Sequence, residues 1–182
     1  MRSLGLEVHL DGARLFNAEV ATGVPAREWC EHADTVSVCS SKGLGAPVGS
    51  LLAGNEATIW EARRARKAFG GGMHQAAVIA AASLYAFEHH VGRLAEDHER
   101  ARRLAVGLVD LGYAVEPPET NIVLVRVEEP RGFLRALTRE GVLATPAKAG
   151  HVRLCTHLDI SDQEIDAVVE VAARLAAHSL EP

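Results

Sequence analysis

The side chains with the clearest chemical potential stand in two short segments, residues 9–14 and 40–47. The first reads His-Leu-Asp-Gly-Ala-Arg, and the second reads Ser-Ser-Lys-Gly-Leu-Gly-Ala-Pro. Each segment follows or completes a short apolar run of the kind that forms a β-strand. In open α/β sheets, ligands gather outside the carboxyl ends of strands, so Asp11 and Lys42 are candidates for a shared site.

Lys42 carries the most specific chemical implication. A lysine among serines and glycines at a strand end is poorly placed to solvate a helix, and it is well placed to form a Schiff base with an aldehyde cofactor. Spacing alone favours a solvated loop lysine, and for Asp11 it favours a turn residue in an Asp-Gly pair. For Arg14 the alternative is a surface position on a helix.

Hydrophobic patterns predict the elements that position these two segments. Apolar residues alternate or cluster in three short runs, and helices fill the intervals between them. The predicted strands cover 6–10, 34–39 and 48–53, and the predicted helices cover 13–21, 56–67 and 73–91. Strands that alternate with helices predict a largely parallel sheet with helices on its faces.

The pattern changes beyond residue 92, where a smaller α+β unit is predicted. Ser161 followed by Glu164 is a capping box, which predicts where the last helix begins. We therefore expect two domains, residues 1–92 and 93–182. The other predicted elements of the second domain are helices over 97–111 and 131–140 and strands over 122–127 and 151–156.

Composition restricts the class of protein. The 182 residues include 19 Lys and Arg against 24 Asp and Glu, which gives a net charge of −5, and 48% are apolar. This balance argues against a protein that binds nucleic acid, and no apolar run reaches the ~18 residues of a membrane span. The first residues lack the apolar stretch of a secretory signal. We expect a cytoplasmic, enzymatic α/β protein with no nucleic-acid or membrane partner.

The cysteines and the clustered histidines do not predict a metal site. Cys30, Cys39 and Cys155 are far apart and lack CxxC spacing, so we expect reduced and mostly buried thiols. His89 and His90 are neighbours on a predicted helix and point about 100° apart, which does not match metal ligands at i and i+4. A solvated helix end is the better interpretation of this segment.

Five ordered motifs span nearly the whole chain. They are the segment at 9–14, Ser-Lys-Gly-Leu-Gly-Ala-Pro-Val-Gly-Ser at 41–50, Arg-Lys-x-x-Gly-Gly-Gly-Met at 66–73, Thr-Asn-Ile-Val at 120–123 and Val-Arg-Leu-x-Thr-His at 152–157. Together they resemble the threonine aldolases, which are pyridoxal-phosphate enzymes grouped with the β-eliminating lyases. The resemblance implies part of an aspartate-aminotransferase-like (PLP fold type I) α/β large domain, followed by a small α+β C-terminal domain.

The resemblance assigns roles around the cofactor, pyridoxal 5′-phosphate. Lys42 matches the lysine that forms the internal aldimine, and Asp11 matches the acid that hydrogen-bonds the pyridine nitrogen. A carboxylate there keeps the ring nitrogen protonated, so that the ring can act as an electron sink. Arg14 points toward the cofactor in the resemblance. Ser40 and Ser41 are candidate donors to the cofactor phosphate, and a role in shaping the turn alone is the alternative.

The resemblance also implies how the substrate is bound. Arg153 matches the arginine that pairs with the substrate carboxylate, because the planar guanidinium binds a carboxylate bidentately. Lys67 and His74 flank the glycine run at 70–72 and are candidate substrate-binding residues, near a helix N-terminus that favours an anion. The family usually has arginine where this chain has His74, and histidine is mostly neutral at pH 7.

These matches imply retro-aldol cleavage of threonine or allo-threonine, a small-molecule amino-acid substrate, to glycine and acetaldehyde. Another β-eliminating amino-acid lyase is the alternative enzyme, and a catalytically silent fragment that acts only in assembly is the non-enzymatic alternative. The chain resembles the carboxyl half of a family member, so a separate N-terminal half is a candidate partner. The family also implies a homo-oligomer, a dimer of dimers. The base that takes the β-hydroxyl proton is not identified.

Overall fold

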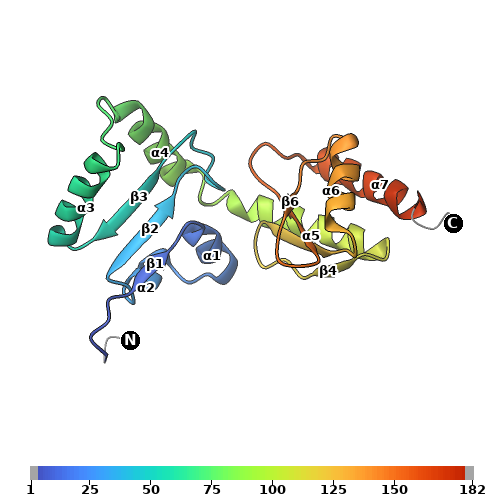
Figure 1. Ribbon diagram of the computed structural model, residues 1–182, viewed down its shortest axis with the longest axis horizontal. Coiled ribbons are helices and arrows are strands. Elements are labelled where there is room, and N and C mark those ends of the chain that lie inside the picture. Colours follow the sequence, from blue (N-terminus) through green and yellow to red (C-terminus); the bar gives the residue numbers. More distant parts are fainter. Residues whose placement is uncertain (1–3, 179–182) are drawn as a thin grey trace. The chain divides into compact units, whose positions relative to one another are not determined.

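Residues 4–178 are described by the computed structural model, which divides the chain into two units, Met1–Leu94 and Ala95–Pro182. Each unit has its own β-sheet with accompanying helices (Figure 1). The fold is mixed α/β, as the sequence predicts.

The first unit is built around a three-stranded sheet with the strand order β1-β2-β3. The strands β1 and β2 are parallel, with His9 opposite Thr35 and Asp11 opposite Ser37. Both strands therefore end at the same edge of the sheet. The elements of this unit are β1 (His9–Asp11), α1 (Leu15–Thr22), α2 (Ala26–Cys30), β2 (Thr35–Cys39), β3 (Ser50–Gly54), α3 (Glu56–Ala68) and α4 (Ala77–His89).

The third strand corrects the expectation of a largely parallel sheet, because β3 runs antiparallel to β2. A parallel connection needs a crossover of a dozen or more residues, usually with a helix. The segment between Cys39 and Ser50 is shorter than that and contains no helix. Instead the chain reverses at Gly49, whose φ of +128° favours glycine. The Ser40 backbone N–H donates to the Gly49 carbonyl at 3.2 Å and closes the reversal.

The predicted helices of the first unit are present, and α3 starts at the predicted residue, whereas α1 and α4 start later than predicted. Helix α4 begins at Ala77 rather than at Met73, because Gln75 has a φ of +49°, which a right-handed helix does not accommodate. Helix α3 begins after Asn55, whose side-chain oxygen accepts a hydrogen bond from the Thr58 N–H at 2.9 Å. The short helix α2 was not predicted, because five residues are too few to show a helical period.

The second unit is built around a four-stranded antiparallel sheet with the order β4-β5-β7-β6. The two predicted strands are its central strands. The edge strands have only two or three residues and give no pattern in the sequence. The elements are α5 (Leu94–Asp110), β4 (Ala114–Glu116), β5 (Ile122–Arg126), α6 (Pro130–Arg139), β6 (Thr145–Pro146), β7 (His151–Cys155) and α7 (Asp162–His178).

One face of this sheet carries the core of the second unit. Val123 and Val125 of β5 stand opposite Leu154 and Val152 of β7, and all four side chains are buried. Because side chains alternate along a strand, Arg153 lies on the opposite face. The buried apolar residues that α5, α6 and α7 contribute to this core include Leu104, Leu108, Leu137, Ile165, Val171 and Ala172.

The start of α7 confirms the predicted capping box. The Ser161 hydroxyl accepts a hydrogen bond from the Glu164 N–H at 3.3 Å, and the Glu164 carboxylate accepts one from the Ser161 N–H at 2.7 Å. Because the Ser161 N–H favours the charged form, it lowers the pKa of the Glu164 carboxyl.

The expectation of mostly buried cysteines is wrong. Cys30 and Cys39 are half-buried and Cys155 is exposed, and none of the three is in a disulfide. Cys155 ends β7 on the face opposite the buried Leu154, so the alternation of the strand turns it away from the core.

Candidate active site

The end of β1 holds Asp11 in a tight turn. The Asp11 Oδ1 atom accepts a hydrogen bond from the Ala13 N–H at 3.1 Å, and the side chain is exposed. Gly12 lies against the neighbouring strand, because a Cβ atom there would come within 2.9 Å of the Ser37 carbonyl oxygen. Asp11 is therefore a turn residue, and the turn leaves its carboxylate exposed at the carboxyl end of the strand.

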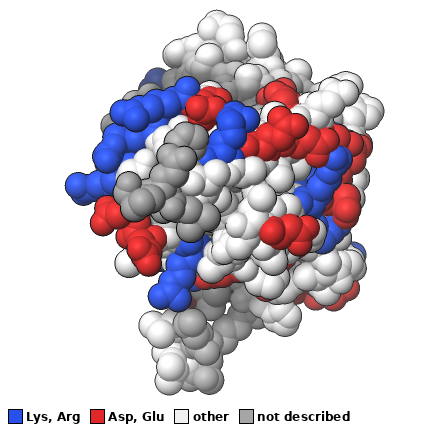
Figure 2. Space-filling model, turned by 90° about the vertical axis from the view of Figure 1, so that its right-hand side faces the viewer, with Lys and Arg blue, Asp and Glu red and all other residues white. Residues whose placement is uncertain are grey.

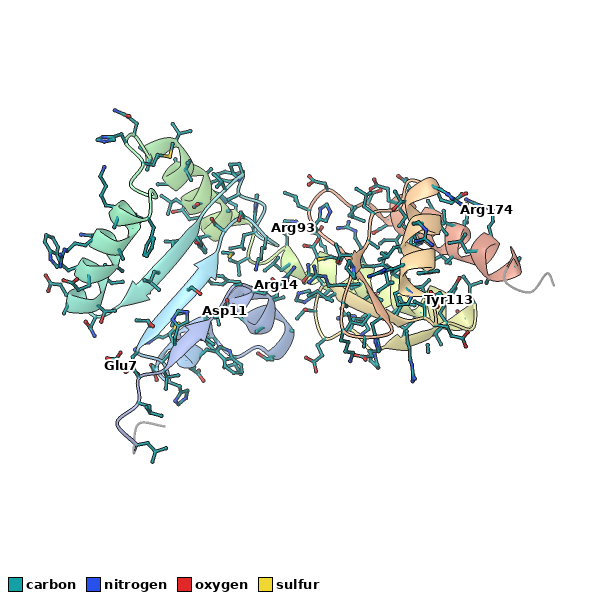
Figure 3. The ribbon with its side chains drawn as sticks, viewed as in Figure 1. Glu7, Asp11, Arg14, Arg93, Tyr113 and Arg174 are labelled. Atoms are coloured by element: carbon teal, nitrogen blue, oxygen red, sulfur yellow. The ribbon has the colours of Figure 1, made fainter. Side chains whose placement is uncertain are left out.

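Arg14 follows this turn at the start of α1 and is half-buried. Figure 3 marks Asp11 at the end of β1 and Arg14 just beyond it. Arg14 borders a narrow gap, without room for a water molecule, that is also lined by Cys39 at the end of β2 and by Gly43 from the loop that follows it. The segments that follow β1 and β2 therefore meet, as a shared site at the strand ends requires.

Lys42 lies in the loop formed by residues 40–49, directly after β2. The backbone turns here, because the Gly45 N–H donates to the Lys42 carbonyl at 2.9 Å. The next two residues, Gly43 and Leu44, are buried, whereas the side chains of Ser41 and Lys42 are exposed. Among residues 4–178 the Lys42 ammonium makes no hydrogen bond or ion pair. It is therefore available to a ligand.

The two parallel strands bring a carboxylate and a primary amine to one edge of the sheet. Because β1 and β2 are in register, Asp11 and the loop 40–49 emerge at the same edge. Gly43 packs against the buried Asn17 of α1, where a Cβ atom would come within 3.1 Å of the Asn17 amide oxygen. This contact anchors the residue after Lys42 to the helix that begins after Asp11. The arrangement can offer an amine nucleophile and an acid to one ligand.

Within the described residues, no polar contact holds Lys67 or His74 at the end of the sheet where Asp11 and the loop 40–49 emerge. Lys67 is in the last turn of α3, His74 precedes α4, and both side chains are exposed. The Lys67 stem runs against Gly72, where a Cβ atom would lie 2.4 Å from the Lys67 Cδ atom. Within the described residues neither side chain makes a hydrogen bond or ion pair with Asp11 or Lys42.

Arg153 belongs to the second unit, in the middle of β7. It stands between Leu124 of β5 and Thr145 of β6 and is half-buried. The Arg153 Nε–H donates to the Thr145 hydroxyl at 3.1 Å. This hydrogen bond occupies one side of the guanidinium and leaves the two terminal nitrogens to bind a carboxylate end-on.

Glu116, another charged side chain on this face of the sheet, has partners of its own. Glu116 of β4 lies 2.5 Å from the Lys148 ammonium and 3.2 Å from the His151 Nε2 atom. The Lys148 hydrogen bond, together with the charges of Lys148 and His151, lowers the pKa of the Glu116 carboxyl. Glu116 is therefore engaged by these two residues rather than by Arg153.

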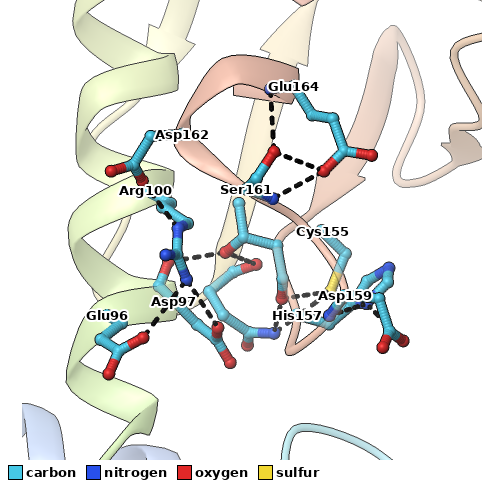
Figure 4. A network of polar contacts seen from close by, with 11 residues as sticks. Glu96, Asp97, Arg100, Cys155, His157, Asp159, Ser161, Asp162 and Glu164 are labelled. Atoms are coloured by element: carbon cyan, nitrogen blue, oxygen red, sulfur yellow. Dashed lines mark hydrogen bonds and ion pairs between the residues drawn. The ribbon is translucent and has the colours of Figure 1, made fainter. Parts of the chain in front are cut away.

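A buried polar network holds the carboxyl end of the strand that carries Arg153 (Figure 4). The Asn121 Nδ2–H donates to the Thr156 carbonyl at 2.7 Å, and the Thr156 N–H donates to the Asn121 carbonyl at 3.0 Å. The Thr156 hydroxyl donates to the Asp97 carbonyl at 2.6 Å. No role for Asn121 or Thr156 was predictable from the motifs alone. The available signal was that Asn121 and Thr156 are polar residues at strand ends in two of the five motifs.

Arg100 closes this network toward solvent. Its Nε–H donates to Asp162 at 2.8 Å, and its Nη1 atom lies 3.5 Å from Glu96 and 3.9 Å from the buried Asp97. The hydrogen bond to Asp162 raises the pKa of the Arg100 guanidinium. Arg100 thereby links helix α5 to the start of α7, next to the segment that follows Arg153.

The comparison with known protein families gives a direct match. The sequence matches the family of β-eliminating lyases over residues 1–130, which is most of the chain. This chain belongs to the β-eliminating lyase family. The matched span includes the Asp11 turn and the Lys42 loop, so the family assignment covers the strand-end site.

Within this family, the chain is similar to proteins named L-threonine aldolases. The low specificity L-threonine aldolase of Escherichia coli (strain K12) is 43% identical over 178 residues, which cover 97% of this chain and 52% of that protein. The low-specificity L-threonine aldolase 1 of Arabidopsis thaliana is 37% identical over 169 residues, 88% of this chain and 47% of that protein. The chain therefore spans about half the length of these relatives.

Solved structures share the fold. A structure of the Leishmania major threonine aldolase superposes with a TM-score of 0.75 at 23% identity, covering 96% of this chain and 53% of that one. The fold of this chain thus corresponds to about half of that longer protein. The predicted resemblance of the fold to the threonine aldolases is confirmed.

No helix in the described part of the chain combines the length and apolarity of a membrane span. Among the same residues, no group of three His, Cys, Asp or Glu side chains could hold a metal ion. On the face shown in Figure 2, acidic and basic side chains are intermixed and do not form a patch of one charge sign.

Proposed function

We propose that this chain carries the reactive lysine and the ring-nitrogen acid of a pyridoxal-phosphate enzyme that cleaves threonine or allo-threonine to glycine and acetaldehyde. The observation that supports this most strongly is the emergence of Asp11 and Lys42 from the same ends of two adjacent parallel strands. Membership of the β-eliminating lyase family and the similarity to named L-threonine aldolases favour the same chemistry.

The residues at the strand ends fit pyridoxal 5′-phosphate. A primary amine without a protein partner can form a Schiff base with an aldehyde, and an exposed carboxylate can accept a hydrogen bond from a protonated pyridine nitrogen. When bound, this cofactor supplies the electron sink for the bond that breaks. Arg14 and Ser41 lie beside the same two residues and are further candidates to bind the cofactor, Ser41 as a donor to its phosphate. The expectation that Ser40 also donates to the phosphate is wrong, because its buried hydroxyl donates to the Gly49 carbonyl.

Each candidate site residue has a separate role in this proposal. Asp11 would hold a proton at the ring nitrogen through its negative charge, and Lys42 would supply the amine that condenses with the cofactor aldehyde, with loss of water. Arg153 binds the substrate carboxylate with its two terminal nitrogens, while Thr145 keeps the guanidinium oriented. Lys67 and His74 are further candidates for substrate binding, although no polar contact supports that role.

The proposal extends to the domains and to assembly. Residues 1–92 would be the remainder of the cofactor-binding domain, and residues 93–182 the small domain of the same fold. Because the relatives are about twice as long, full activity is expected to require the other half of that fold. We expect the assembled enzyme to be a cytoplasmic homo-oligomer, a dimer of dimers, with a free amino acid as substrate.

Reductive labelling tests the central assignment. The three lysines of the sequence are Lys42, Lys67 and Lys148. After incubation with pyridoxal phosphate and borohydride, peptide mapping is expected to place the label on Lys42. A Lys42→Arg variant, which retains the charge, is the matched control and should lose that label. Label on Lys67 or Lys148 in preference to Lys42 would contradict the assignment.

Acetaldehyde release then separates the possible activities. Threonine cleavage by an assembly that contains this chain supports the aldolase. Release of a different β-substituent from another amino acid would identify a different lyase of the family. Labelling of Lys42 without turnover of any amino acid, even with the other half of the fold present, would indicate a catalytically silent chain.

A further inference from the structure

The loop that carries Lys42 is closed on itself by backbone hydrogen bonds. The Ser40 N–H donates to the Gly49 carbonyl at 3.2 Å, and the Ala46 N–H donates to the Ser40 carbonyl at 2.9 Å. The backbone of Ser40 is thus hydrogen-bonded both to the last residue of the loop and to a residue in its middle. Whatever fixes Ser40 also fixes the frame from which Lys42 projects.

Ser40 is fixed by a hydroxyl on a different element. Its side chain is 0% exposed, and its Oγ–H donates to the Gly49 carbonyl at 3.1 Å. The Ser40 Oγ atom also lies 2.9 Å from the Oγ atom of Ser83, which is 8% exposed on α4. A hydroxyl has a single hydrogen, and Ser40 uses it on Gly49, so Ser83 is the donor between the two serines. The hydrogen bonds therefore run from α4 to Ser40 and on to Gly49.

There is little free space around the hydroxyl groups of Ser40 and Ser83. A Cβ atom at Gly49 would lie 3.2 Å from the Ser40 Oγ atom and 3.5 Å from the Ser83 Oγ atom, close to the limit for such contacts. A buried hydroxyl without a partner is costly, so this close packing keeps the two serines paired. The packing and the hydrogen bonds thus specify one position for this end of the loop.

The other side of the loop is anchored separately. The His90 Nδ1 atom lies 2.6 Å from the Leu44 carbonyl oxygen, and Leu44 is buried beside Ala86 and Leu94. Lys42 therefore projects from a short stretch held on one side through Ser40 and on the other through Leu44. The apolar contacts of Leu44 can hold that side without Ser83, whereas Ser40 has no apolar side chain for such contacts.

We propose that Ser83 is a positioning residue for Lys42 and acts through the buried hydroxyl of Ser40. This inference rests on the proposed function, because it takes Lys42 as the residue that reacts with the cofactor. Within the described residues, Ser83 makes no hydrogen bond to Lys42 and bonds to Ser40 instead. It fixes the loop in the conformation that directs the lysine amine outward.

Hydrogen exchange tests the loop without any cofactor. In the full chain, Ser83→Ala should raise the exchange rate of the Ser40 and Ala46 amides roughly 2- to 10-fold, as expected from the loss of one buried hydrogen bond. Ser50→Ala, which truncates an exposed serine just after the loop, is the matched control and should leave both rates unchanged. Unchanged exchange of these amides in Ser83→Ala would overturn the proposal.

Labelling with pyridoxal phosphate and borohydride gives the second measurement. Ser83→Ala should slow the labelling of Lys42 without changing that of Lys67 and Lys148, and Ser83→Thr, which keeps the hydroxyl, should restore it. Faster exchange without any change in Lys42 labelling would restrict Ser83 to a structural role and overturn the inference. If the unaltered chain labels elsewhere than Lys42, the proposed function fails, and the exchange data still report on the loop.

A double variant separates positioning from folding. Ser83→Ala alone leaves the Ser40 hydroxyl in a buried site with one partner fewer, which can destabilise the whole unit. Ser40→Ala combined with Ser83→Ala removes both hydroxyls and avoids that cost. The double variant should fold with the stability of the unaltered chain and still show fast loop exchange and slow Lys42 labelling. A double variant with normal labelling would contradict the proposal.

Discussion

Strands β5 and β7 of the second unit each bury two side chains on one face, whereas the apolar strand β3 of the first unit buries none. The helices differ in the same way. Helices α5 and α7 direct apolar side chains into a continuous core, but α4 is apolar along most of its length and buries only Ser83 and Ala86. The large apolar side chains that are exposed in the first unit include Leu51, Leu52, Trp60, Phe69, Met73, Val78 and Leu84.

This difference shows what holds the candidate catalytic residues in place. Arg153 lies in a strand whose other face is part of a complete core, and the Asn121–Thr156 network fixes the end of that strand. Lys42 lies in a unit with fewer buried apolar contacts, so its position depends on particular contacts such as the Ser40–Ser83 pair. An apolar surface of this extent is also where further contacts would stabilise the first unit.

Expressing the two units as separate chains should give the largest difference in folding between them. Residues 95–182 contain a closed core and are expected to unfold cooperatively when expressed alone. Residues 1–94 are expected to aggregate or to stay without fixed tertiary packing, because an exposed apolar sheet and unpaired strand edges favour association. Thermal unfolding with near-ultraviolet circular dichroism checks both. A cooperative transition of residues 1–94 as a monomer would remove the contrast between the units.

Truncation of one leucine in each unit should reproduce the contrast on a smaller scale. Leu108 is 1% exposed, so Leu108→Ala should lower the free energy of unfolding by about 2–5 kcal/mol. Leu51 is 48% exposed, and Leu51→Ala should change it by no more than about 0.5 kcal/mol. Urea denaturation of the full chain measures both. Equal losses would show that β3 is covered in solution.

Arg153, the arginine proposed to bind the substrate carboxylate, should show a smaller and more specific effect. Arg153→Lys removes a bidentate contact, so binding of glycine or threonine should weaken by about 1.5–3 kcal/mol. Reduction of the cofactor onto Lys42 should be unaffected. Arg126→Lys, on the same face of the sheet, is the matched control. Spectral titration with glycine measures the affinity, and an unchanged value for Arg153→Lys would assign the arginine to structure alone.

The smallest effect should be a pH dependence confined to the second unit. His98 is 2% exposed, and burial, helped by the positive charge of Arg102 and opposed by Asp97, lowers its pKa below 6.5. The unfolded chain therefore binds this proton first, and stability should fall as the pH drops below 6.5. Urea denaturation at pH 7.5 and 5.5 should show a smaller loss for His98→Gln than for the unaltered chain. Identical losses would mean that His98 titrates normally.

The sequence by itself determined which residues could do chemistry and where most elements lie. The motifs around Asp11 and Lys42 identify strand ends because apolar runs, glycines and an Asp-Gly turn act over a few neighbouring residues. The capping box at Ser161 was predictable for the same reason, since both of its hydrogen bonds join residues three apart. Arg153 stood out because a charge is unusual in an otherwise apolar strand.

Only the tertiary structure decided how these segments are held. The direction of β3 depends on the Gly49 reversal and on pairing with β2, which no local pattern specifies. The Ser40–Ser83 and Asn121–Thr156 pairs join residues 43 and 35 positions apart, and a buried polar side chain takes its partner from whatever the fold packs beside it. Periodicity reports whether a side chain is buried, but the partner that satisfies it is chosen by packing between distant parts of the chain.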